Sequence, residues 1–278
     1  MCRLYFTIDL EEWWAVHSFQ NYFRDHPNHY SDRIEEGLEN ILHLLKRYNQ
    51  SATFFVLGRI AKKYPQLIKR IVDEGYDLGT HGYGHELVYE MSEKEFEKDL
   101  VQSIKILQDI SGLKIDKYRA PSYSITKNTL WALPVLYRNG IRIDSSIASG
   151  KNFRYGIRHA SRQPYKIKLN EEDYIIEIPP NSLDFKMFSL PVTSGFGFRF
   201  FPLKLISRSI KNFRKNSISP IITLHNWEFD TDHPKIKAGT IARMIHYYNL
   251  QSVENKVKQL FSIYKFQDMR ELPLTDKI

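Results

Sequence analysis

The sequence predicts an α/β fold, in which a parallel sheet is covered on the outside by helices. Apolar strand-like runs alternate with amphipathic helical segments along the first half of the chain, which is the pattern of such folds. The length of 278 residues is normal for one α/β barrel. Because 42% of the residues are hydrophobic, including 17 Tyr and 17 Phe, the chain can also fill a large core. We therefore expect a single domain over residues 1–278.

The first predicted elements are two strands and the helix between them. Residues 4–8 and 52–57 are short apolar runs of the kind found in buried strands. Residues 32–48 have the pattern of an amphipathic helix, and Asp32 with Glu35 resembles a capping box at its start. The apolar face of this helix consists of Ile34, Leu38, Ile41 and Leu45.

The alternation continues with a helix, a third strand and another helix. The first helix restarts at Pro65 and stops at Gly75, and residues 76–79 follow as a strand. Ser92 and Glu95 then form a capping box for the next helix. Its inward face consists of Phe96, Leu100, Ile104 and Leu107.

The rhythm breaks after Ile141. Residues 151–201 contain one clear strand signal, at 174–178, and we interpret this region as an elaboration over one end of the barrel. The rhythm resumes with an apolar run at 221–224, and a capped C-terminal helix is expected to begin near Ser252.

Charge and cysteine usage narrow the partners and the compartment. The formal net charge is +8, but the Lys and Arg residues are scattered rather than interleaved with aromatics, so we expect no nucleic-acid partner. Cys2 is the single cysteine and cannot form an internal disulfide. Since the sequence has neither a signal peptide nor an apolar run near the ~20 residues of a membrane span, we expect a cytoplasmic protein without an integral membrane segment. The sequence gives no indication of oligomeric state.

Two carboxylates follow the first predicted strand. Asp9 and Glu11 point to the same side of an extended chain, and carboxylates so placed repel each other unless a cation or an arginine lies between them. Acidic residues after a strand more often belong to a loop or a helix cap, so this motif needs support from others.

Two histidines follow the third predicted strand. His81 and His85 lie four residues apart in the run THGYGH, and such a pair can bind one metal ion from a glycine-containing loop. A lone histidine is usually packed or on the surface, whereas two at this spacing are a stronger signal. With Glu11 they make a two-histidine, one-carboxylate set, which leaves positions open for water and substrate.

Two further motifs each follow a strand-like run. Arg119, in the run YRAPSY, could keep a buried carboxylate ionised, although a surface arginine before a turn is more common. His225, in the run ITLHNW, is a natural general acid near neutral pH, although a packed histidine beside Trp227 is again the more common case.

Taken in order, the four motifs resemble those of the polysaccharide deacetylase family, also called carbohydrate esterase family 4 or the NodB-homology fold. The family has an acidic first motif, then His-x-x-x-His, then Arg-x-Pro, and a late Leu-His. The motifs of this chain are similar in order and spacing along most of its length. The chain is most like the subgroup with Asp-x-Glu-Asp first and His-Pro-Trp-Glu-Phe-Asp last; these read DLEE from Asp9 and HNWEFD from His225 here. The resemblance implies a distorted (β/α) barrel with its site at the C-terminal strand ends.

The resemblance also implies a role for each motif residue. Asp9 would be the general base and His225 the general acid. Arg119 would orient Asp9, and Asp144 would orient His225 through a looser match. The implied metal ligands are Glu11, His81 and His85.

The sequence departs from the family pattern in two places. Most members have adjacent aspartates in the first motif, so Glu11 as a ligand follows the spaced variant. Ser122 stands where many members have an aromatic residue whose backbone N–H serves the oxyanion. A backbone donor survives that replacement, but the wall facing the substrate changes.

The function implied by the resemblance is that of a metal-dependent hydrolase in carbohydrate metabolism. It would remove N-acetyl groups from a sugar in a polysaccharide or its glycan precursor, using one Zn²⁺, or else Co²⁺, Ni²⁺ or Mn²⁺. Asp9 would take a proton from water, a backbone N–H near Ser122 would stabilise the oxyanion, and His225 would protonate the departing amine.

Two other functions stay open. Relatives of this subgroup hydrolyse small cyclic amides or ureides with a metal, and a deep, closed pocket would favour that reaction over a polymer. A non-catalytic carbohydrate-binding protein on the same fold is the third possibility. The combination of a base, ligands, an arginine and an acid argues against it, because a lectin needs no general acid.

Overall fold

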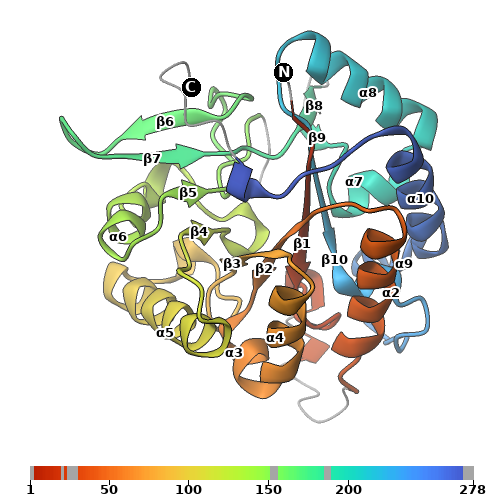
Figure 1. The fold of residues 1–278 in the computed structure, drawn as a ribbon, viewed down its shortest axis with the longest axis horizontal. Helices are drawn as coiled ribbons and strands as arrows, with labels where there is room; N and C mark the ends of the chain where they lie inside the picture. Colours follow the sequence, from red (N-terminus) through yellow and green to blue (C-terminus); the bar gives the residue numbers. More distant parts are fainter. Residues whose placement is uncertain (1–2, 20–21, 24–30, 151–155, 185–188, 272–278) are drawn as a thin grey trace.

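The computed structural model describes residues 3–19, 22–23, 31–150, 156–184 and 189–271. Within them, one eight-stranded sheet has the order β10-β1-β2-β3-β4-β5-β7-β6 (Figure 1). All neighbours in it are parallel except β6, which pairs antiparallel with β7 at one edge. Its strands are β1 (Tyr5–Leu10), β2 (Thr53–Val56), β3 (Asp77–Thr80), β4 (Lys117–Tyr118), β5 (Ile143–Asp144), β6 (Tyr165–Lys168), β7 (Tyr174–Glu177) and β10 (Ile221–His225). The curled sheet with helices around it confirms the distorted (β/α) barrel that the sequence predicted.

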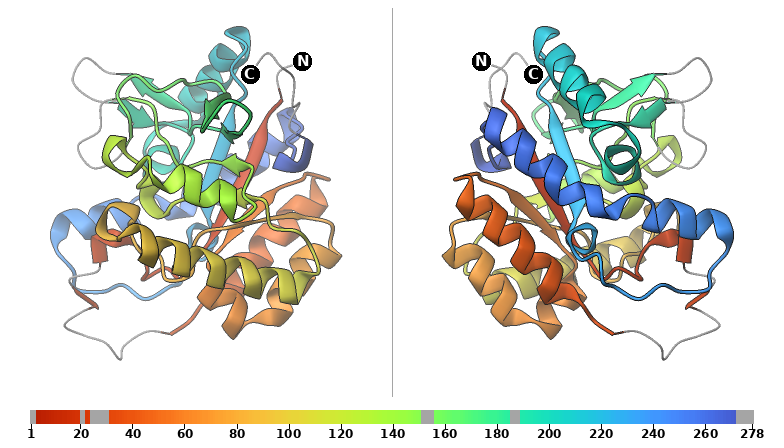
Figure 2. Two further views of the ribbon diagram at one scale, coloured as in Figure 1. Left: turned by 90° about the vertical axis from the view of Figure 1, so that its left-hand side faces the viewer. Right: turned by 90° about the vertical axis from the view of Figure 1, so that its right-hand side faces the viewer.

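Helices surround this sheet, as the views in Figures 1 and 2 show. The α-helices are α2 (Ile34–Arg47), α3 (Gly58–Lys63), α4 (Pro65–Asp73), α5 (Glu93–Ser111), α6 (Ala132–Arg138), α7 (Gly195–Phe200), α8 (Leu203–Lys215), α9 (Thr240–Tyr247) and α10 (Val253–Ile263). Short 3-10 helices are η1 (His17–Phe19), η2 (Val88–Glu90), η3 (Pro121–Tyr123), η4 (Lys127–Thr129), η5 (Asn226–Phe229), η6 (Leu250–Ser252) and η7 (Met269–Glu271). Among the described residues, no helix combines the length and apolar character needed to cross a bilayer.

The predicted helix faces are buried, but two predicted caps are wrong: α10 begins after Ser252 as expected, yet the Ser252 hydroxyl donates to the Asn249 carbonyl and does not cap the helix. The apolar faces expected for α2 and α5 lie in the main core. At α5, Ser92 and Glu95 form both hydrogen bonds of a capping box, as the sequence predicted. At α2, however, the N-cap is Arg33, which makes no side-chain cap. Asp32 instead accepts a hydrogen bond from Tyr64 Oη at 2.7 Å, because this hydroxyl competes for the same carboxylate.

The region 151–201 contains more regular structure than its sequence indicated. Part of it, at 151–155 and 185–188, lies outside the described residues. The rest carries the hairpin of β6 and β7, two short strands and α7. The short strands, β8 (Ser182–Asp184) and β9 (Ser189–Pro191), form a separate two-stranded sheet. Because β7 pairs parallel with β5, this region extends the barrel sheet itself rather than only covering one end.

Candidate active site

The motif residues lie at the C-terminal ends of neighbouring strands. Asp9 pairs in register with His225 across β1 and β10. His81 directly follows β3, and Arg119 directly follows β4. Since these strands are parallel, their ends meet at one edge of the sheet, where (β/α) barrels carry their sites.

Glu11, His81 and His85 form a buried group that could hold a metal ion. The Oε2 atom of Glu11 lies 2.8 Å from His85 Nε2 and 3.7 Å from His81 Nε2. One ligand atom from each residue lies within 4.8 Å of the other two. Within the described part of the chain, this is the one cluster of three or more such side chains that meets this criterion.

The hydrogen bonds around this group prepare it for a cation. His81 Nδ1 lies 2.8 Å from the backbone oxygen of Arg119, so this nitrogen carries the proton and Nε2 keeps its lone pair toward Glu11. Glu11 Oε1 accepts a hydrogen bond from Trp227 Nε1 at 3.1 Å, which leaves Oε2 facing the histidines. Burial opposes the charge on Glu11, but His85 and other histidines hold its pKa well below the usual value. An ionised carboxylate facing two imidazole nitrogens fits a divalent ion with open positions.

Asp99 of α5 holds the loop between the two histidines. Its carboxylate accepts two backbone N–H groups of the loop, at 2.7 and 3.0 Å. Gly82 has a φ of +77°, and a Cβ there would lie 2.8 Å from Asp99 Oδ2. His85 itself has a φ of +67°, which is uncommon for a residue with a side chain. Such a conformation persists only where the surroundings hold it, and Asp99 provides part of that support.

Arg119 forms a buried ion pair with Asp9. Its Nη1 lies 2.7 Å from Asp9 Oδ1 and 2.9 Å from Thr7 Oγ1. The opposite side of the guanidinium donates to the Ser145 hydroxyl at 3.0 Å. Its Cζ also lies 4.1 Å from the ring centroid of Phe55. These contacts leave the guanidinium one orientation, and they thereby orient the Asp9 carboxylate.

His225 is held by a second buried ion pair. Its Nδ1 lies 2.9 Å from Glu228 Oε2, and the other oxygen of Glu228 lies 2.7 Å from Arg199 Nε. Burial opposes the charged imidazole, but Glu11 and Glu228 raise the pKa of His225 to about 9. The ring is therefore protonated at neutral pH, as a general acid must be. Glu228 occupies the position that the resemblance implied for Asp144.

Asp144 is accordingly not the group that orients His225. It is fully buried, and its Oδ1 accepts a hydrogen bond from Ser146 Oγ. Its other neighbour is Glu177 of β7. Burial raises the pKa of Asp144 to about 6. Burial and the nearby charge of Asp144 raise the pKa of Glu177 well above its usual value. The two carboxyls therefore keep their protons to a higher pH than exposed carboxyls do. Ser146 Oγ also accepts the Ala120 N–H at 2.8 Å, so this pair supports the Arg-x-Pro motif.

The segment after Arg119 has an unusual backbone. Ser122 and Tyr123 have φ values of +52° and +54°, in the left-handed region. Ser122 is exposed, whereas the Tyr123 ring centroid lies 6.0 Å from Arg119 Cζ. The aromatic ring next to Arg119 thus comes one position later than in the family pattern.

Four residues near the site were assigned no role from the sequence. Trp227 and Glu228 belong to the run after His225, and the spacing of three residues between His225 and Glu228 was a usable signal. Asn226, in the same run, accepts the Glu11 N–H at 2.9 Å. Arg199 is only 2% exposed and comes from α7, so nothing in its local sequence indicated a contact with Glu228.

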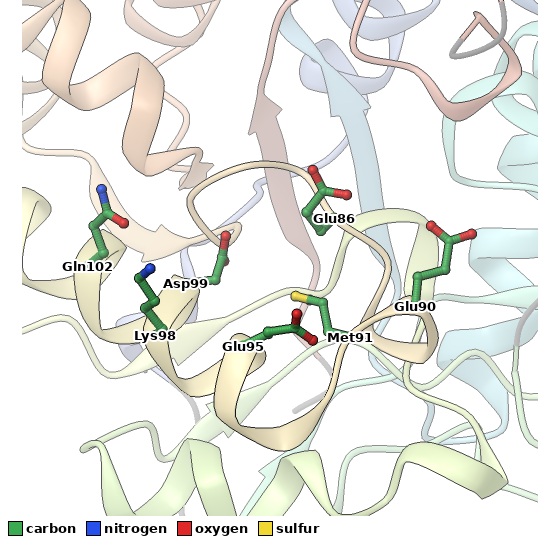
Figure 3. A pocket seen from close by; sticks show the side chains of 7 residues that line it. All are labelled: Glu86, Glu90, Met91, Glu95, Lys98, Asp99 and Gln102. Carbon is green, nitrogen blue, oxygen red and sulfur yellow. The ribbon is translucent and has the colours of Figure 1, made fainter. Parts of the chain in front are cut away.

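A cavity of about 360 Å³ lies beside the histidine loop and is separate from the metal group (Figure 3). Its lining residues are Glu86, Glu90, Met91, Glu95, Lys98, Asp99 and Gln102. None of the candidate metal ligands is among them, and Asp99 connects the cavity with the site through the loop. We therefore assign the chemistry to the strand ends rather than to this cavity.

Two sequence families match the chain in succession. Residues 23–137 match the family described as polysaccharide deacetylase, and residues 145–273 match a domain of unknown function (DUF3473). The first region contains His81, His85 and Arg119, and the second contains Arg199 and His225. The candidate site therefore draws on both.

Two of the curated relatives are bacterial deacetylases. A peptidoglycan deacetylase of Helicobacter pylori is 28% identical over 180 residues, which are 59% of this chain and 60% of that protein. A peptidoglycan-N-acetylglucosamine deacetylase of Bacillus cereus is 38% identical over 98 residues, which are 35% of this chain and 36% of that protein. The matches thus span less than two thirds of these relatives.

Solved structures share the fold over nearly the whole chain. A Mycobacterium smegmatis protein assigned to the polysaccharide deacetylases has a TM-score of 0.65 at 18% identity, covering 96% of this chain and 86% of that one. A CE4 family pseudoenzyme from Bacillus anthracis has a TM-score of 0.50 at 15% identity, covering 97% and 64%. Residues 23–137 are thus similar to the polysaccharide deacetylase family, and the relatives and the motif order agree with this similarity.

Proposed function

We propose that this protein is a metal-dependent hydrolase that removes N-acetyl groups from a sugar in a polysaccharide or its glycan precursor. The observation that carries the proposal is one edge of the barrel, where a buried Glu/His/His group, an arginine-bound Asp9 and a His225 bound to Glu228 lie together. The deacetylases among its relatives support an N-acetylated sugar as substrate. We propose Zn²⁺ as the ion, because it favours sites of this composition.

Asp9 is the base in this proposal. When bound, the divalent ion would act as a Lewis acid and lower the pKa of water. Asp9 takes the proton of the attacking water with the carboxylate oxygen that does not bind Arg119 Nη1. Arg119 keeps that oxygen directed at the reacting atoms, because its own position is fixed from several sides. A backbone N–H near Ser122 stabilises the oxyanion.

His225 is the acid in this proposal. The departing amine is a poor leaving group unless it is protonated, and His225 carries a proton at neutral pH. Its Nδ1 is bound to Glu228, so Nε2 is the atom that donates the proton. Glu228 stabilises the imidazolium before transfer and fixes the plane of the ring.

The test is to measure bound metal and acetate release together on N-acetylglucosamine oligomers. Wild type should bind about one ion per chain and release acetate, and His81→Ala should lose both, because two remaining ligands hold zinc weakly. His43→Ala removes an exposed histidine of α2 and should change neither.

Other outcomes would redirect the proposal. An absence of bound metal in wild type would contradict the ligand set. Bound metal without acetate release, together with ring opening of a cyclic ureide, would identify the small-amide hydrolase. Binding of the oligomers with neither reaction would identify a carbohydrate-binding protein.

A further inference from the structure

Helix α9 presents an apolar stripe to the outside of the molecule. The stripe repeats at positions i, i+3, i+4 and i+7 and consists of Ile241, Met244, Ile245 and Tyr248, which are 71, 55, 37 and 42% exposed. In a globular protein, an apolar face with this period normally packs on the core. Here the opposite side of α9 does so, since the His246 ring stacks on Trp227 with centroids 4.3 Å apart. In both views of Figure 2, α9 lies at the outer margin of the molecule.

A second helix continues the stripe toward the candidate active site. Phe200 of α7 is 48% exposed, and its ring centroid lies 5.9 Å from that of Tyr248. At the start of α7, a Cβ on Gly195 would lie 3.4 Å from Cε1 of His225. The apolar surface therefore extends from α9 to the helix that borders the proposed acid. Since a helix with its side chains is about 10 Å across, the stripe and the site are close neighbours.

Positive charge accompanies the stripe. Lys235, Lys237 and Arg243 are exposed, and the sequence has no Asp or Glu from 233 to 253. Tyr247 of α9 fixes the segment before the helix: its hydroxyl donates to the carbonyl before Lys235 at 2.8 Å and accepts the N–H after it at 3.1 Å. The two lysines are thus held beside the helix that carries the apolar stripe.

We propose that α9 docks on an anionic membrane surface. An exposed apolar stripe with adjacent lysine and arginine is the combination that lies in the boundary between lipid headgroups and acyl chains. A second copy of this chain fits less well, because a symmetric pair would bring the same three cations together. Docking goes beyond the proposed deacetylation and does not depend on it.

The experiment measures binding of the full chain to sedimented vesicles, without any catalytic readout. Wild type should bind vesicles of equal parts phosphatidylglycerol and phosphatidylcholine, and bind far less to phosphatidylcholine alone. Ile241→Ser with Met244→Ser should weaken binding at least about tenfold. Replacing Lys235, Lys237 and Arg243 by Gln should weaken it roughly a hundredfold.

Controls separate docking from misfolding and from self-association. Ile263→Ser removes an apolar side chain that is 63% exposed at the far end of α10, and it should bind like wild type. Thermal unfolding of each variant should match wild type, since all substituted residues are exposed. The proposal is overturned if wild type ignores phosphatidylglycerol, or if Ile263→Ser loses as much binding as the α9 variant. It is also overturned if light scattering finds a wild-type dimer that the α9 variant converts to monomer.

Discussion

The two halves of the chain build their parts of the candidate site in different ways. In residues 4–137 the proposed groups lie on the last residues of a strand or in the loop directly after it. Their supporting contacts include the Arg119 carbonyl for His81 and the Arg119 guanidinium for Asp9. In residues 145–271 only His225 arrives on a strand of the sheet, while Glu228 and Arg199 come from short helices. The deacetylase family matches residues 23–137 of the first half, after Asp9 and Glu11, and a domain of unknown function matches residues 145–273.

This difference shows what the second half contributes. Both halves contain a buried ion pair: Asp9 with Arg119 and Glu228 with Arg199. The first pair orients the proposed base, and the second holds the proposed acid. Trp227 also reaches across from the second half to a ligand of the first, Glu11. The region of unknown function is therefore an integral part of the proposed site.

Replacing Asp9 by Asn should give the largest effect, because it removes the base and breaks the ion pair of the first half. We expect acetate release to fall roughly a thousandfold or more. Arg119 would be left buried without a counter-charge, which should cost about 3–5 kcal/mol of unfolding free energy. Kinetics and urea unfolding measure the two effects. Bound metal should be unchanged; if it disappears with activity, Asp9 is a ligand rather than the base.

Replacing His225 by Ala tests the corresponding group of the second half. We expect acetate release to fall about a hundredfold to a thousandfold, because the departing amine loses its proton donor. Metal content should stay at the wild-type level, since Glu11, His81 and His85 remain. A loss of metal as large as in a ligand variant would show that His225 binds the ion.

Replacing Glu228 by Gln should change the pH dependence more than the maximal rate. Despite burial, Glu11 and Glu228 raise the pKa of His225 to about 9, so the protonated acid is present below that pH and is lost as the pH rises through it. The stability contributed by this charged ring follows the same sign: it is complete below the unfolded pKa of about 6.5 and lost through about 9. Without the Glu228 charge, the alkaline limb should move to lower pH.

The measurement is the pH profile of kcat/KM for acetate release. We expect a fall in rate of about tenfold near neutral pH, as for other groups that act through a neighbour. Glu95→Gln, in the exposed capping box of α5, is the control and should leave the limb in place. An unshifted limb in Glu228→Gln would mean that Glu228 is only structural.

Replacing Gly37 by Ala should give the smallest effect, at the contact between the halves. A Cβ on Gly37 of α2 would lie 2.2 Å from the backbone oxygen of Asn226, so α2 or η5 must move. We expect a loss of about 1–3 kcal/mol in unfolding free energy. Gly239→Ala is the control, because a Cβ there meets nothing within 4 Å. Equal melting temperatures for both variants would contradict a tight contact between the halves.

Local patterns in the sequence were sufficient for the barrel and for placing the motif residues of the first half at the ends of strands. Three kinds of feature depend on residues only a few positions apart: the strand periods, the apolar faces of α2 and α5, and the Ser92–Glu95 cap. Such features can be predicted directly from the order of residues in the chain. The same locality explains the wrong cap at α2: Asp32 accepts a hydrogen bond from Tyr64, which lies 32 positions away in the sequence.

The sequence by itself determined the alternating fold, the order of the motifs and the residues that end the strands, because each of these is written in short-range periodicity. Only the tertiary structure decided which side chains contact and orient these motif residues. Trp227 reaches Glu11 across 216 positions, and Arg199 reaches Glu228 from a different helix. Asp144 lies beside Glu177 and not beside His225, because parallel pairing of β5 with β7 brings the two carboxyls together. Contacts between distant segments follow from how strands pair and helices pack. Local patterns in the sequence do not report this pairing and packing.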